Sequence, residues 1–161
     1  MINHKLYDLM DEFIKKRDAQ TRASGFTTVL NSNHICLILK DGHPISYGSN
    51  IYLPNKKLNK HAESNALEKF EKIVKRVKPQ KRQKIDLFII RTNKSSSKPC
   101  NRCINEMVSY NNSGKVDIRN IYYTCKDYLH GIRNVKFRKL VQEERYYCSY
   151  DIHYNSASSN V

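Results

Sequence analysis

The 161-residue chain has no apolar run close to the roughly 20 residues that a membrane-spanning helix requires. Its opening residues, MINHKLYDLMDEF, also lack the apolar core of a secretion signal. These absences argue against a membrane or secreted protein. We therefore expect an intracellular protein, cytoplasmic or nuclear, that does not bind membranes.

Acidic residues are scarce, with 15 Asp and Glu against 29 Lys and Arg, so the formal net charge is +14. The segment 72–84 alone carries seven basic residues and no acid. A surface of this kind attracts phosphate, whether on a nucleotide or on a nucleic acid. It can equally be a solvated basic face, so charge alone does not choose the partner.

A disulfide framework is also absent, because the five cysteines are odd in number and irregularly spaced. In a reducing compartment, a Cys-x-x-Cys pair is more often a metal or redox site than a structural cross-link. Cys100 and Cys103 form such a pair. We expect Cys36, Cys125 and Cys148 to be core or surface residues.

Hydrophobic periodicity and turn chemistry predict the order helix, hairpin, helix, strand, helix, strand. Asp41-Gly42 predicts the hairpin turn, Pro79 ends the second helix, and 49–60 reads as a polar loop. The predicted helices cover 5–19, 61–77 and 100–110, and the predicted strands cover 35–39, 44–48, 85–90 and 118–124. The apolar face of the second helix consists of Ala66, Leu67, Phe70, Ile73, Val74 and Val77. The segment 135–141 could be strand or helix, and 146–150 looks extended.

This order predicts an α/β fold, a three-layer α/β/α sandwich around a mixed central sheet. Since no interior linker interrupts the pattern, we expect a single domain over residues 1–154. Residues 155–161 read as a flexible tail.

Three metal-type ligands and one carboxylate stand at the starts of two predicted helices. His61-Ala62-Glu63 opens one helix, and Pro99-Cys100-Asn101-Arg102-Cys103 opens the other. Two cysteines three positions apart place both sulfurs on one face of a helical turn. One imidazole and two thiols can hold zinc with a fourth position open, as catalytic zinc sites require. If the two helix starts face each other, their dipoles favour thiolates at the metal.

The pattern His-x-Glu followed by Pro-Cys-x-x-Cys resembles the signature of the cytidine/deoxycytidylate deaminase superfamily of zinc enzymes. The resemblance covers about residues 1–125. It implies a cytidine-deaminase-like fold, with Zn²⁺ held by His61, Cys100 and Cys103. It also implies that Glu63 is not a ligand and instead carries protons, while zinc-bound hydroxide attacks the base and ammonia leaves.

The same resemblance suggests substrate contacts. It implies that Asn50 binds the sugar or base, and that the backbone N–H of Ala62 contacts the base carbonyl. Asn50 could instead be an ordinary turn residue. Tyr123 or its neighbour Tyr122 could stack on the base, although both positions are equally compatible with the core. The histidines at 34, 43, 130 and 153 are scattered and receive no catalytic role.

The resemblance favours a hydrolytic deaminase acting on a cytosine-type nucleoside or nucleotide, and it implies a homo-oligomer. A polynucleotide or tRNA base deaminase is the alternative enzyme, in which the basic segment 72–84 would contact the nucleic-acid backbone. A catalytically silent, nucleic-acid-binding zinc protein is the third reading. The carboxylate of Glu63 argues against that third reading, because a structural zinc site has no need of a proton carrier.

Overall fold

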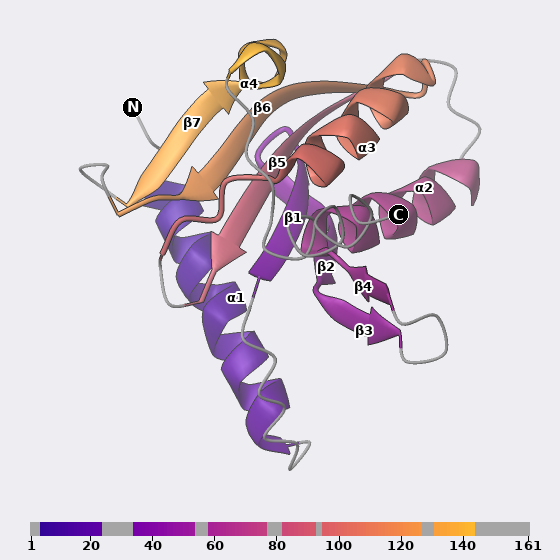
Figure 1. Cartoon of the computed structure of the whole chain (residues 1–161). Helices are drawn as coiled ribbons and strands as arrows, with labels where there is room; N and C mark the ends of the chain where they lie inside the picture. The colour runs from indigo at the N-terminus through magenta and orange to yellow at the C-terminus, as the bar shows by residue number, and fades with distance from the viewer. Residues whose placement is uncertain are drawn as a thin grey trace, which may run out of the picture.

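A computed structural model describes residues 4–23, 34–53, 58–76, 82–92, 95–126 and 131–143. It is the predicted sandwich: a mixed five-stranded sheet lies between helices (Figure 1). The predicted tail at 155–161, the extended segment at 146–150, Pro79, His130, His153 and Cys148 lie outside the described residues. No helix within the described ranges is long and apolar enough to cross a membrane.

The predicted hairpin is confirmed. Strands β1 (His34–Lys40) and β2 (His43–Ser49) pair antiparallel around a two-residue turn. Asp41 and Gly42 both have positive φ, 50° and 78°, which is the backbone that a tight hairpin turn requires.

The sheet has the order β2-β1-β5-β6-β7. Strand β5 (Gln83–Arg91) runs antiparallel to β1 and parallel to β6 (Val116–Thr124), with helix α3 (Asn101–Asn112) as the crossover. Strand β7 (Ile132–Lys136) closes the sheet antiparallel to β6. This topology brings the start of β1 and the ends of β2, β5 and β6 to one edge of the sheet.

Two apolar clusters fill the two spaces between the layers. On one face, helix α1 (His4–Ala23) covers side chains of β1, β5 and β7. On the other, helices α2 (Ala62–Arg76), α3 and α4 (Phe137–Gln142) cover a larger cluster (Figure 1). Strand β5 is buried from Ile85 to Ile90, as its apolar run predicts for a strand covered on both faces.

Three local expectations need correction. The segment 49–60 is not wholly loop, because β3 (Ile51–Leu53) and β4 (Leu58–Lys60) pair as a small second sheet. Ile73, which the helical period places on the buried face of α2, has 44% of its surface exposed, because the far end of the helix is less covered than its start. Helix α3 continues two residues further than expected, and 135–141 contains both the end of β7 and most of α4.

Candidate metal centre and active site

His61 stands immediately before helix α2. Its carbonyl oxygen accepts the first helical hydrogen bond, from the Asn65 N–H at 3.0 Å. Strand β4 ends at Lys60, whose ammonium pairs with Glu68 on the second turn of α2. These contacts hold the histidine at the helix N-terminus, as the sequence predicts.

The two cysteines open helix α3, with Cys100 at the N-cap position and Cys103 in the first turn. The loop before them is attached to the sheet by Ser97, a buried residue whose hydroxyl donates to the carbonyl of Ile89 at 2.8 Å. Ser97 also exchanges hydrogen bonds with Thr124 at the end of β6: each backbone N–H donates to the other residue, at 2.9 Å in both cases. The loop that carries Cys100 is therefore fixed to the ends of two central strands.

The three predicted ligands meet although 39 residues separate His61 from Cys100. His61 Nδ1 lies 3.1 Å from Cys103 Sγ and 3.6 Å from Cys100 Sγ, and the two sulfurs are 3.6 Å apart. In a zinc tetrahedron with ordinary bond lengths these edges would be about 3.6 Å (N···S) and about 3.8 Å (S···S). The donor set and its spacing therefore fit zinc. No other described His, Cys, Asp or Glu joins this group, which leaves one coordination position open.

The two thiols differ electrostatically. The hydrogen bond between the two sulfurs, together with the one to His61, lowers the pKa of Cys100 to about 4. The same hydrogen bond, with burial, raises the pKa of Cys103. The hydrogen bond to Cys100 raises the pKa of His61. This environment favours a thiolate at Cys100, and a bound cation would favour thiolates at both positions.

Glu63 lies in the first turn of α2 with 6% of its surface exposed. Burial raises the pKa of its carboxyl group. The fully buried thiol of Cys36 on β1 is close enough for the Glu63 charge to raise its pKa, although burial is the larger cause. One residue further along α2, the Ser64 hydroxyl donates to Glu106 on α3 and so joins the two helices. The carboxylate therefore lies beside the ligands in a nearly dry environment.

Asn50 and Ala62, the two predicted substrate contacts, meet each other. The Ala62 N–H donates to Oδ1 of Asn50 at 2.8 Å. Two more hydrogen bonds join the end of β2 to the start of α2, from Asn65 Nδ2 to the Ser49 carbonyl at 2.9 Å and from the Ser46 hydroxyl to the Ala66 carbonyl at 3.0 Å. Asn50 thus anchors the start of helix α2, and its role toward a substrate stays a prediction.

Tyr123 has 1% of its surface exposed and packs in the cluster beneath α2 and α3. Its ring lies 5.9 Å from the guanidinium carbon of Arg133, and burial raises the pKa of its hydroxyl group. Tyr122 lies on the opposite face and packs against the α1 cluster. Of the two tyrosines, only Tyr123 is on the side of the sheet that carries the ligands, and its stacking on a base stays a prediction.

Two residues that sequence reasoning left without a role lie at the same edge of the sheet. His34 begins β1 and is paired with Arg91, the last residue of β5. Burial and the charge of Arg91, with a smaller effect of His61, lower the pKa of His34 to about 4. Strand alternation could have indicated this position, since His34 is two residues from the buried Cys36.

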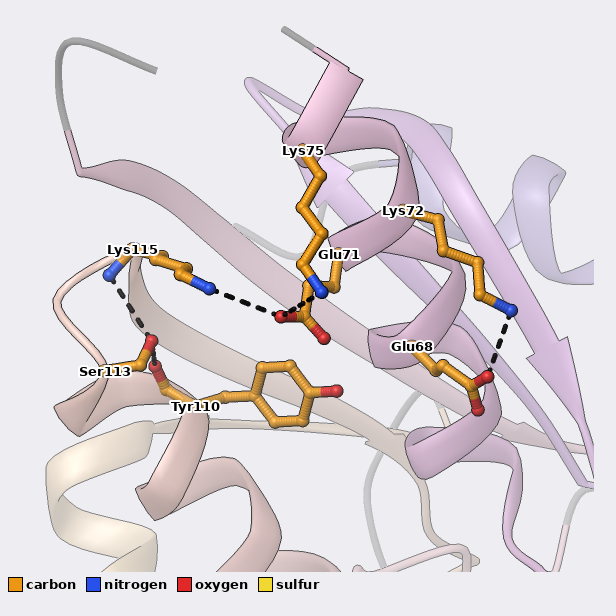
Figure 2. A network of polar contacts seen from close by, with 7 residues as sticks. All are labelled: Glu68, Glu71, Lys72, Lys75, Tyr110, Ser113 and Lys115. Carbon is orange, nitrogen blue, oxygen red and sulfur yellow. Dashed lines mark hydrogen bonds and ion pairs between the residues drawn. The ribbon is translucent and has the colours of Figure 1, made fainter. Parts of the chain in front are cut away.

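The basic segment 72–84 is only partly described, because residues 77–81 lie outside the described ranges. Figure 2 shows that its lysines on α2 are paired with acids: Lys72 with Glu68 at 3.0 Å, and Lys75 with Glu71 at 3.2 Å. Lys115 at the start of β6 reaches the same Glu71 at 3.4 Å. Lys75 is also about 21 Å from His61, since 14 residues at about 1.5 Å each separate them along the helix.

Comparison with solved structures identifies the fold. A cytidine deaminase from Burkholderia pseudomallei aligns with a TM-score of 0.54 at 15% identity, over 87% of this chain and 96% of that one. A cytidine deaminase from Mycobacterium leprae (TM-score 0.47, 14% identity, 82% and 97% covered) and a dCMP deaminase from cyanophage S-TIM5 (0.40, 16%, 84% and 90%) also align. No protein-family model and no curated protein sequence matches the chain. The chain has the cytidine-deaminase fold.

Proposed function

We propose that this protein is a zinc-dependent hydrolytic deaminase of a cytosine-type nucleoside or nucleotide. The observation that carries the proposal is the meeting of His61, Cys100 and Cys103 at separations of 3.1 to 3.6 Å, close enough to share one ion, with Glu63 beside them. A purely structural zinc site would more often have four protein ligands. The match of the fold to a cytidine deaminase supports the same reading.

Each residue of the candidate site then has a role in the reaction. His61 and the two cysteines would hold the ion, which supplies the acidity that makes water a nucleophile at neutral pH. Glu63 would accept a proton from that water and deliver it to the ring nitrogen, while the water oxygen bonds to the amine-bearing carbon. Glu63 would then pass the remaining proton of the added hydroxyl to the amine, so that the C–N bond breaks, ammonia leaves and a carbonyl remains. The network of Ser97 and Thr124 would keep Cys100 in place through these steps.

The test is ammonia release by zinc-loaded protein on cytidine, deoxycytidine, CMP and dCMP, with adenosine, guanine, single-stranded DNA and tRNA beside them. Glu63→Gln should retain one zinc per chain and lose turnover by at least about a hundredfold, because proton transfer contributes roughly 10²–10⁴ in rate. Cys103→Ser should lose the metal itself. Zinc binding by the wild type without turnover of any substrate would refute the deaminase and leave the metal site.

The polynucleotide alternative receives less support. The described lysines at the far end of α2 are paired with Glu68 and Glu71 and lie a helix length from the ligands. Turnover of an oligonucleotide with strong salt dependence, and none of CMP or cytidine, would nevertheless establish it.

A further inference from the structure

Strand alternation places Arg91 on the face of the sheet that carries the metal ligands. On β5, Ile89 packs in the cluster under α2 and α3, whereas Ile90 packs under α1. Successive side chains on a strand point to opposite faces, so Arg91 points to the side of Ile89. The same rule applies on β1, where Cys36 packs under α2 and Ile35 under α1, so His34 shares the face of Arg91.

The register and the electrostatics agree with this placement. His34 and Arg91 are direct cross-strand partners in the antiparallel ladder. His34 is within electrostatic reach of both His61 and Cys100. The pair therefore stands at the edge of the sheet where the starts of α2 and α3 bring the ligands together.

Arg91 is half-buried, and no described side chain pairs with its guanidinium group. Its backbone N–H is satisfied by the Thr124 hydroxyl at 3.2 Å, which fixes the end of the strand. A half-buried guanidinium group attracts an anion more strongly than an exposed one, because its surroundings are less polar than water.

We propose that Arg91, with His34 beside it, binds the phosphate group of the substrate, so that the enzyme acts on a cytosine nucleoside monophosphate. This inference rests on the proposed deaminase function. A guanidinium binds phosphate oxygens through two parallel hydrogen bonds. The N-terminal ends of α2 and α3 add positive potential at the same edge. A single half-buried arginine suits one terminal phosphate, which carries close to two negative charges, better than a track of backbone diesters.

The experiment compares kcat/KM for CMP and dCMP with that for cytidine and deoxycytidine. The wild type should prefer the monophosphates, and Arg91→Gln should lower the ratio of monophosphate to nucleoside by about 10- to 100-fold, the value of a charge-assisted hydrogen-bond pair. Arg91→Lys should keep part of the preference. Arg138→Gln removes the same charge from an exposed position on α4, which follows the end of β7 that lies away from Arg91, and should leave the ratio unchanged.

A ratio that Arg91→Gln leaves unchanged, or a wild type that turns over nucleosides as well as monophosphates, would overturn the inference while leaving the deaminase intact. A second comparison measures kcat/KM for an oligonucleotide that contains one cytosine. An Arg91-dependent preference for the oligonucleotide over CMP would overturn the assignment to a mononucleotide.

A measurement of substrate binding tests the phosphate site independently of the proposed deaminase activity. The dissociation constants of CMP and cytidine are measured by calorimetry with zinc-loaded Glu63→Gln protein, with and without Arg91→Gln. Tighter binding of CMP that is lost with Arg91, in a protein whose wild type releases no ammonia, would support the phosphate site and refute the deaminase. Equal binding of CMP and cytidine would overturn the phosphate site whatever the turnover.

Discussion

Gly48 sets how closely helix α2 approaches the sheet. A Cβ at this position would lie 2.4 Å from the Ala66 nitrogen, 2.5 Å from the Ala62 oxygen and 2.9 Å from the Asn65 carbonyl carbon. Ordinary contacts of a Cβ begin near 3.4 Å, so β2 and α2 must separate by about 1 Å to accept Gly48→Ala. The obstacles are backbone atoms, which cannot move aside as the end of a side chain can.

We expect Gly48→Ala to lower the free energy of unfolding by about 3 kcal/mol, the upper part of the range for overpacking. For a chain of this size this loss corresponds to a fall in Tm of roughly 6–12 °C. The displacement also lengthens the hydrogen bond from Ala62 to Asn50 and moves His61 away from the sulfurs. Zinc affinity, measured by competition with a chromophoric chelator, should therefore fall about 10- to 100-fold, as it does when residues that orient metal ligands are changed.

Gly42→Ala is the matched control, because it lies in the same hairpin with open space around it. Gly42 has φ of +78°, so alanine there costs about 1 kcal/mol of backbone strain and touches nothing. Zinc affinity should stay at the wild-type value. If Gly48→Ala were no more destabilising than Gly42→Ala and bound zinc equally well, the reasoning from close approach would be wrong.

Three further predictions concern single residues. Ser97→Ala should lower the free energy of unfolding by about 1–3 kcal/mol in urea titrations, because it leaves the buried carbonyl of Ile89 and the N–H of Thr124 unpaired; an unchanged midpoint would contradict the network. The folded pKa of His34, about 4, lies below its ordinary 6.5, so its stabilising effect is present above pH 6.5 and is lost as the pH falls toward 4. Between pH 8 and pH 6 the wild type should lose at most about 0.8 kcal/mol more than His34→Gln, and equal losses would show that His34 is not held neutral. Glu71→Gln should cost no more than about 1 kcal/mol, and the cost should shrink in high salt, because Glu71 pairs with lysines at an exposed surface.

The elements of this fold could largely be predicted from the sequence because their signals are local. Asp41-Gly42 predicts the hairpin from its turn chemistry alone, and the apolar run from Ile85 to Ile90 predicts a strand buried on both faces. The exceptions are elements whose partners are not local. Strands β3 and β4 have three residues each and are stabilised by pairing with each other, and segments this short carry no periodic pattern that would predict a strand.

The candidate ligands could also be identified from the sequence, since metal chemistry depends on residue types at short spacing. Cys100 and Cys103 share one helical turn, and His61 and Glu63 share another. Their identity and order were sufficient to predict zinc before any geometry was known.

Only the tertiary structure brought the two halves of the site together and showed what surrounds them. The distance of 3.1 Å between His61 and Cys103, and the cross-strand pair of His34 and Arg91, depend on the order of strands in the sheet. Such contacts join residues more than 40 positions apart, and no local pattern encodes them. The sequence by itself therefore determined most of the secondary structure and the choice of candidate metal ligands, because both depend on near neighbours. The sheet topology decided which distant side chains share the site, because long-range packing sets those distances.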